Sequence, residues 1–190
     1  MTLNDARETS AVDLTFRPST ADDLPMLHRW LNEPGVVEWW EGDDVSWDAV
    51  ARDYGPDRDD GTEHWIAALD GRDIGWIQCY AAKDSEDERQ AWFPLGVSED
   101  AAGIDYLLGE PVERGKGVGS AMIRAFVHQV VFGRHPEWTQ ACASPYAANV
   151  ASCRALEKAG FRFLGVVEDV EGPCHLMVID RPHAEAPTDG

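Results

Sequence analysis

A glycine-rich loop is the part of the sequence whose residues most directly indicate chemistry. Gly115, Gly117 and Gly119 lie within five residues, just before a segment whose apolar residues have helical spacing. Without Cβ atoms, such a backbone can curl so that several N–H groups converge at the positive end of a helix. Arg114 and Lys116 add positive charge. The loop therefore predicts a binding site for a phosphate or pyrophosphate group.

Two common nucleotide-binding patterns do not fit this loop. A P-loop needs four residues between its glycines and a hydroxyl residue after Lys, whereas five residues separate Gly109 from Gly115 and Gly117 takes the hydroxyl position. A dinucleotide fingerprint needs GxGxxG near the start of a βαβ unit, and this GKGVG lies late in the chain. The pyrophosphate of coenzyme A is a further candidate, and a flexible loop with incidental glycines is the structural alternative.

The surrounding elements predict one α/β domain with a mixed sheet over residues 1–190, with loose ends at 1–12 and 182–190. Asp70-Gly71 predicts a hairpin, Asn149 a helix start and Gly160 a helix end. An acidic segment of about fifteen residues before the fourth strand is expected to be turn-rich. Strands are expected at 14–17, 65–69, 74–80, 102–108, 138–143, 161–167 and 176–179, and helices at 24–31, 46–50, 122–131 and 149–159.

The composition of the chain argues against some classes of binding partner. The chain carries 16 Lys and Arg against 35 Asp and Glu, a net charge of −19, which repels nucleic acid and anionic membranes and attracts cations. An acidic, soluble surface explains the same charge without any ligand. No apolar stretch is long enough to span a bilayer and no secretory signal is visible, so we expect a cytoplasmic protein.

The potential metal ligands show no recognisable spacing. The four cysteines, Cys79, Cys142, Cys153 and Cys174, form no CxxC pair, and the six His residues are dispersed. Four buried thiols in a reducing compartment are the simplest interpretation. The sequence therefore predicts no metal site.

The loop and two later motifs together resemble the GNAT N-acetyltransferase superfamily. The resemblance rests on Arg114, Gly117 and Gly119, on Asn149 with Ala151, and on Glu157–Phe161, and the order of elements agrees over about residues 14–180. It implies the acyl-CoA N-acyltransferase fold, an α/β fold with a mixed, mostly antiparallel central sheet flanked by helices. It also implies acetyl-CoA as the acetyl donor and a cationic amine as the small-molecule acceptor.

Within that superfamily the sequence looks most like the aminoglycoside 6'-N-acetyltransferases, although siderophore-type hydroxylamine acyltransferases share parts of the pattern. The matching segments are 27–32, 37–40, 103–105, 115–119 and 157–161. The resemblance implies that the following residues bind acetyl-CoA: Ile104, Tyr106, Leu107, Arg114, Gly115, Lys116, Gly117, Val118, Gly119, Ser120 and Asn149.

The resemblance places the acceptor beside Asp105, Glu171, Trp39 and Trp40. Asp105 matches the family's Gly-Ile-Asp carboxylate and is expected to take the amine proton or to anchor the amine. Alternatively, Asp105 has a structural role and ends the strand through a hydrogen bond with the backbone. Glu171 could bind a distal amine, and the tryptophans could flank a sugar ring or a cation, with core packing as their alternative role.

Two positions depart from the family pattern. Leu156 stands where many members have a tyrosine that protonates the departing thiolate; water, Tyr146 or Tyr106 could take that role. Ser144 stands where aminoglycoside enzymes often have an aspartate. Three hypotheses follow: transfer to the 6'-amine of an aminoglycoside, transfer to another amine or hydroxylamine such as a polyamine or siderophore precursor, and a non-catalytic acyl-CoA-binding module. The sequence leaves a monomer and a homodimer open.

Overall fold

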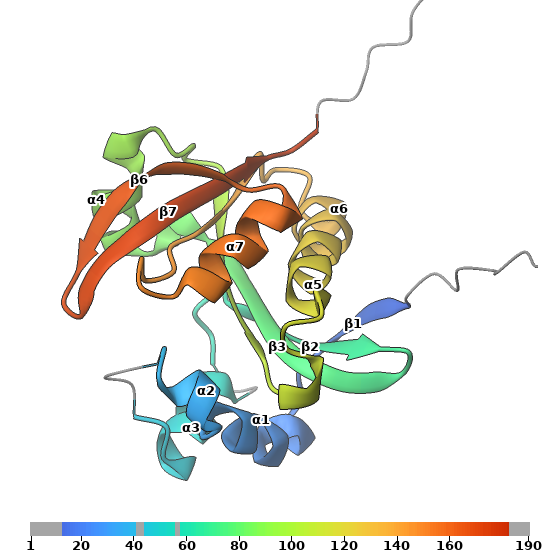
Figure 1. The fold of residues 1–190 in the computed structure, drawn as a ribbon. Coiled ribbons are helices and arrows are strands. Elements are labelled where there is room, and N and C mark those ends of the chain that lie inside the picture. The colour runs from blue at the N-terminus through green and yellow to red at the C-terminus, as the bar shows by residue number, and fades with distance from the viewer. Residues whose placement is uncertain (1–12, 41–43, 56–57, 183–190) are drawn as a thin grey trace, which may run out of the picture.

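A seven-stranded sheet forms the centre of the molecule (Figure 1). The computed structural model describes residues 13–40, 44–55 and 58–182. The order of strands across the sheet is β1-β2-β3-β4-β5-β7-β6, with β4 and β5 parallel and the other described pairs antiparallel. The strands are β1 (Leu14–Pro18), β2 (Glu63–Leu69), β3 (Arg72–Ala81), β4 (Ala101–Leu108), β5 (Gln140–Ala143), β6 (Arg162–Asp169) and β7 (Gly172–Asp180).

Helices cover both faces of this sheet. In Figure 1, α5 and α7 lie side by side over one face, α1 to α3 gather at the β2–β3 end, and α4 lies beside β6. The mixed, mostly antiparallel sheet with flanking helices confirms the expected fold. The α-helices are α1 (Leu24–Leu31), α2 (Pro34–Val37), α3 (Trp47–Tyr54), α4 (Glu86–Trp92), α5 (Val118–Phe126), α6 (Phe132–Arg134) and α7 (Val150–Ala159).

Alternating side chains in the central strands fill two separate hydrophobic layers. Ile66 and Trp76 pack with α1 and α3, whereas Trp65 and Ile77, one residue away in each strand, pack with α5. Successive residues of a strand point to opposite faces, so adjacent apolar residues can serve both layers. These layers hold β3 and β4 in place between the helices.

The parallel pair β4–β5 creates the opening that holds the site. β4 pairs with β5 only from Ala101 to Gly103, while its pairing with β3 extends to Leu108. β5 ends at Ala143. The second half of β4 therefore has a neighbouring strand on one side only, and its other edge faces the region between the glycine loop and α7.

Four local features of the structure differ from the expectations. The acidic segment expected to be turn-rich contains α4, because Ser85 caps the backbone N–H of Glu88 and acidic residues fill the first turn, where the helix dipole favours them. The helix after the glycine loop is α-helical only to Phe126 and continues as a π-helix over Val127–Val131. The short α2 was not expected, and α3 extends beyond the expected 46–50.

Other local signals are confirmed. The Asp70-Gly71 turn joins β2 to β3, with positive φ angles of 49° and 75°. Asn149 caps α7, and Gly160 ends it with a φ of 107°. Of the expected loose ends, 1–12 and 183–190 lie outside the described residues. No helix in the described part of the chain is both long enough and apolar enough to cross a membrane.

Candidate active site

Two adjoining cavities lie along the open edge of β4. The loop cavity, of about 380 Å³, is bordered by the glycine loop from Arg114 to Ser120 and by one face of α7. The acidic cavity, of about 400 Å³, is bordered by Asp105 and Asp169. Residues that line both cavities are Trp39, Trp40, Tyr106, Asn149 and Ser152. A molecule in one cavity can therefore reach a molecule in the other.

The backbone of the glycine loop is shaped for an anion. Gly115 and Gly117 have positive φ angles of 76° and 82°, a conformation that costs other residues about 1–2 kcal/mol. Gly117 is also the residue from which α5 starts. Gly119 and Ser120, in the first turn of α5, line the loop cavity. The first N–H groups of a helix have no partner within the helix, and the helix dipole favours negative charge there.

Cationic side chains add to this anion site. Arg114 lines the loop cavity and is held by its Nη2 and Nε, which donate to the Leu108 carbonyl at 3.0 and 3.3 Å. Arg154 and Lys158 line the same cavity from α7. Sequence reasoning did not assign these two residues to the site; their spacing of four residues, which places them on one helix face, was the available signal. The described lining includes no carboxylate.

The acidic cavity is organised around Asp105. In the β3–β4 register this residue lies directly opposite Gln78, whose Nε2 donates a hydrogen bond of 2.7 Å to Asp105 Oδ2. Both residues line the cavity and Asp105 is half-buried. The amide fixes one carboxylate oxygen, and a half-buried carboxylate in a cavity can accept a proton or bind an ammonium group.

Further carboxylates continue outward from Asp105. A third hollow, of about 360 Å³, is lined by Asp105 and also by Asp60, Asp84 and Glu88, together with Arg58. Tyr80 OH donates to Glu88 Oε1 at 2.9 Å, and burial, reinforced by the nearby carboxylates, raises the pKa of Tyr80. The tyrosine therefore stays protonated. An acceptor with several positive charges would find carboxylates over an extended surface.

The junction of the two cavities carries a tyrosine–serine pair. The hydroxyls of Tyr106 and Ser152 are 2.7 Å apart, and burial raises the pKa of Tyr106 above its usual value. Asn149 Oδ1 accepts the Ser152 backbone N–H at 3.0 Å, so its side chain helps to start α7. Trp40 donates through Nε1 to Tyr54 OH at 3.0 Å and is half-buried, which combines packing with a position in the cavity wall.

The structure brings most of the sequence-predicted site residues together. Of the residues expected to bind acetyl-CoA, those that line the loop cavity are Tyr106, Leu107, Arg114, Gly115, Gly117, Gly119, Ser120 and Asn149. Ile104 lines the acidic cavity instead. Lys116 and Val118 line neither of the two cavities, and Lys116 Nζ lies 3.9 Å from Glu113 Oε2.

Only some of the residues expected to bind the acceptor line a cavity. Trp39, Trp40 and Asp105 line the acidic cavity, whereas Glu171 is exposed in the β6–β7 turn and lines neither of the two cavities. Asp169, two residues earlier, does line the acidic cavity and was not predicted. It ends β6, and only the pairing of β6 with β7 brings that end over the site.

The two departures from the family pattern also have clear positions. Leu156 is fully buried in the core and lines neither of the two cavities. Ser144, which follows β5, lines the acidic cavity. The position without a tyrosine is therefore closed by packing, and the position without an aspartate faces the acidic cavity.

Comparison with known proteins gives a consistent family. The acetyltransferase (GNAT) domain family matches residues 19–169. The chain is 36% identical to aminoglycoside N(6')-acetyltransferase type 1 of Klebsiella pneumoniae over 172 residues, which is 88% of this chain and 83% of the relative. It is 29% identical to the lysine N-acyltransferase MbtK of a Mycobacterium species over 185 residues, 95% of this chain and 72% of the relative.

A solved structure shows the same architecture. The structure of AAC(6')-Ib in complex with paromomycin and acetyl-CoA superposes with a TM-score of 0.79 at 36% identity, covering 89% of this chain and 94% of that one. The glycine loop and the opening beside β4 are consistent with the family domain that matches this chain. The chain belongs to the GNAT acetyltransferase family.

Proposed function

We propose that this protein transfers the acetyl group of acetyl-CoA to the 6'-amine of an aminoglycoside, by direct attack of the amine while both substrates are bound. The observation that carries the proposal is the meeting of two cavities of opposite charge at Tyr106 and Ser152. The loop cavity suits a pyrophosphate, and the acidic cavity suits a polycationic acceptor.

The residues present fit acetyl-CoA as the donor. Left-handed glycines, the start of α5 and three cations form an anion site at the outer end of the loop cavity. The cavity then follows β4, where Tyr106, Leu107 and Leu108 offer an edge with strand geometry for an extended arm. The resemblance to AAC(6')-Ib, solved with acetyl-CoA, supports the same assignment. Positioning two substrates in this way is itself a large catalytic contribution.

Asp105 is the residue we assign to the acceptor amine. An ammonium group cannot attack a thioester, so its proton has to leave, and Asp105 lies in the acidic cavity next to the shared wall. Gln78 holds the carboxylate in one orientation. Asp105 therefore anchors the amine and accepts its proton, directly or through water.

Tyr106 is the residue we assign to the departing thiolate. Its side chain lines both cavities and its hydroxyl is already hydrogen-bonded to Ser152, whereas Tyr146 lines only the acidic cavity of the two. The raised pKa of Tyr106 keeps its hydroxyl protonated and able to donate. A thiol pKa near 8.5 makes the thiolate a fair leaving group, so this assistance is modest.

The negative surface around Asp105 supports an aminoglycoside as the acceptor. Asp169 and the hollow containing Asp60, Asp84 and Glu88 can bind amines distant from the reacting one. The relatives named for aminoglycosides support the same class. Four free, buried cysteines support a cytoplasmic location as part of the proposal.

A second candidate is transfer to another amine or hydroxylamine, such as a polyamine or a siderophore precursor. Ser144 favours it, because this position of the acidic cavity carries no charge. The similarity to a lysine N-acyltransferase supports the same class.

Steady-state kinetics separates these candidates. Kanamycin-type substrates with and without a 6'-amine, polyamines and small hydroxylamines are compared by the release of free thiol. We expect turnover only with acceptors that have a 6'-amine. Equal turnover without that amine would refute the regiochemistry, and a preference for hydroxylamines would favour the second candidate. An inactive wild type that still binds coenzyme A would favour a non-catalytic module.

A further inference from the structure

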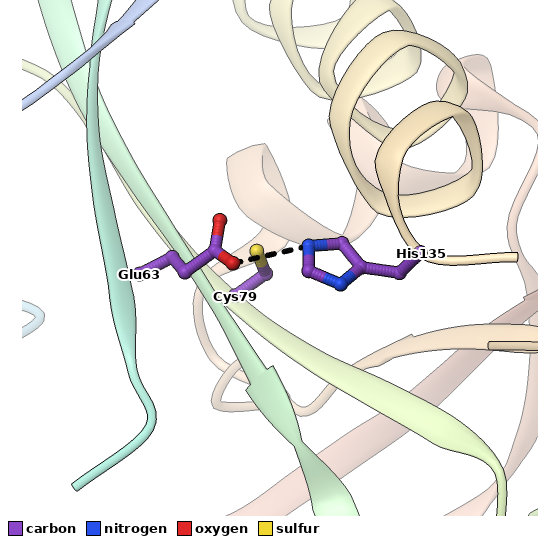
Figure 2. Close-up of side chains that lie close together, drawn as sticks. All are labelled: Glu63, Cys79 and His135. Atoms are coloured by element: carbon purple, nitrogen blue, oxygen red, sulfur yellow. Dashed lines mark ion pairs between the residues drawn. The ribbon is translucent and has the colours of Figure 1, made fainter. Parts of the chain in front are cut away.

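A cluster of three potential metal ligands lies outside both cavities. Glu63 begins β2, Cys79 lies near the end of β3, and His135 follows α6. Glu63 and Cys79 are direct partners in the β2–β3 register, which places their side chains on the same face of the sheet. Figure 2 shows the His135 ring pointing toward them from the opposite side. The three residues are far apart in sequence, so their spacing gave no sign of a site.

The donor atoms are arranged around a common point. One carboxylate oxygen, the thiol sulfur and one ring nitrogen all lie within 4.8 Å of one another. His135 Nε2 is 3.2 Å from Glu63 Oε1, yet within the described residues this buried nitrogen makes no hydrogen bond. Donors that share a tetrahedral zinc ion are about 3.3–3.6 Å apart, given metal–ligand bonds of about 2.0–2.3 Å. The His135 nitrogen and the Glu63 oxygen are therefore close together, but they do not have the geometry of a hydrogen bond.

Neighbouring groups orient both of these side chains. Trp65 Nε1 donates to Glu63 Oε2 at 3.2 Å, which leaves Oε1 facing His135. His135 Nδ1 lies 3.5 Å from Glu137 Oε1, and the ring stacks on Trp138 with centroids 3.9 Å apart. A carboxylate at the second ring nitrogen is the usual outer partner of a metal-binding histidine, because it fixes the tautomer and raises the basicity of the ligand.

We propose that Glu63, Cys79 and His135 bind one Zn²⁺ ion, with water in the fourth position. Thiolate, imidazole and carboxylate are the donors that zinc takes in proteins, and magnesium or calcium would need a set of oxygens. Cys79 is fully buried, while the Glu63 side chain is 39% exposed and gives the ion a path of entry. The proposal is independent of the acetyl transfer.

Binding exchanges a proton for the ion. Burial raises the pKa of the Cys79 thiol, with Glu63 adding to the shift and Arg134 opposing it. The thiol is therefore protonated at neutral pH, and formation of the S–Zn bond breaks the S–H bond and releases one proton to the buffer. We therefore expect affinity to fall as pH falls.

The ion would connect parts of the fold that are separate in sequence. Glu63 and Cys79 belong to adjacent strands, and His135 belongs to the segment between α6 and β5. Cys79 and Gln78 are neighbours in β3 and point to opposite faces, so the site lies across the sheet from the Asp105 side chain. Its effect is accordingly on stability rather than on the reaction.

Metal binding to the whole chain tests this proposal. The protein is treated with a chelator, dialysed and titrated with Zn²⁺, and separately with Co²⁺, whose thiolate complexes have a charge-transfer band in the near ultraviolet. We expect one tight equivalent of Zn²⁺, a higher melting temperature with zinc, and a thiolate–cobalt band. Cys79→Ser should lose the band, and His135→Asn should lose the zinc-dependent shift in melting temperature.

Matched variants separate this site from weak binding elsewhere. Cys153→Ser is the thiol control, because Cys153 Sγ lies 3.8 Å from His175 Nδ1 in a second cysteine–histidine pair. Glu137→Gln should weaken zinc affinity about 10-fold or more, whereas Glu86→Gln, an exposed change in α4, should not. If the folded wild type shows no thiolate–cobalt band, or if Cys153→Ser removes it, the proposal is wrong. If Cys79→Ser does not fold, Glu63→Gln is tested instead, because the Glu63 side chain is half-exposed.

Discussion

The two cavities beside β4 are built in different ways. The loop cavity is shaped mainly by backbone: left-handed glycines, a helix start and the edge of a strand, with Arg114, Arg154 and Lys158 adding positive charge. The acidic cavity is shaped by side chains from several elements, with Asp105 and Asp169 supplying negative charge. The glycine loop supplies much of the loop cavity from one short segment, Arg114 to Ser120, whereas the carboxylates of the acidic cavity come from strands that are distant in the sequence.

This difference explains why the donor is easier to identify than the acceptor. A backbone anion site needs glycines at fixed positions, so it leaves a short motif in the sequence. A side-chain site can be altered one residue at a time, as Ser144 and Asp169 show. Substitutions in the two cavities should therefore have separable effects on the two substrates.

The largest effect is expected from Asp105→Asn, which removes a negative charge from the acidic cavity. The change keeps the size of the side chain but removes its negative charge and its basicity. We expect kcat/KM for the acceptor to fall about 100-fold or more, with little change in coenzyme A binding. Steady-state kinetics and a direct coenzyme A titration measure this. Asp100→Asn, exposed just before β4, is the control. Full activity of the Asp105 variant would remove that residue from the mechanism.

Tyr106→Phe should have the next largest effect, because Tyr106 belongs to both cavities. The change removes the hydroxyl that pairs with Ser152 and keeps the ring. We expect kcat to fall about 10- to 100-fold, at the low end of general-acid effects because thiolates leave well. The KM values of both substrates should change much less. If Tyr146→Phe lowers kcat more than Tyr106→Phe does, the role belongs to Tyr146.

Gly117→Ala tests the loop cavity alone. A left-handed residue with a Cβ costs about 1–2 kcal/mol, and relief of that strain would turn the loop N–H groups away from the donor. We expect the KM for acetyl-CoA to rise about 5- to 30-fold while the KM for the acceptor is nearly unchanged. Gly96→Ala is the matched control, because Gly96 also has a positive φ, of 99°, and lines neither of the two cavities. Equal kinetic effects of both variants would point to general instability.

Ser144→Asp should have the smallest effect, and it increases the difference in charge between the two cavities. An added carboxylate in the acidic cavity is expected to lower the KM of a polycationic acceptor about two- to fivefold, the range of a solvated ion pair. The KM for acetyl-CoA should stay the same. Ser144→Asn has a similar shape without the charge and should not reproduce the gain. If the KM is unchanged for both high-affinity and low-affinity acceptors, the acceptor amines do not bind near residue 144.

Local sequence signals predicted much of the fold. Asp70-Gly71, Asn149 and Gly160 act through their own backbone geometry or caps, and each marks the expected turn or helix end. α4 was missed because its acidic residues resemble a solvated loop, and its buried residue Trp92 becomes informative only when it packs beside β4 and β7.

The sequence by itself determined the family and predicted the donor site, because the glycine loop, Asn149 and residues 157–161 are short-range patterns whose chemistry depends on the backbone nearby. It also identified Asp105 by motif. Only the tertiary structure placed Asp169 rather than Glu171 at the acidic cavity, selected Tyr106 over Tyr146 at the junction, and brought Cys79 to Glu63 and His135. The physical reason is the same in each case. These contacts join residues distant in the chain, so strand register and helix packing decide them, and spacing in the sequence does not.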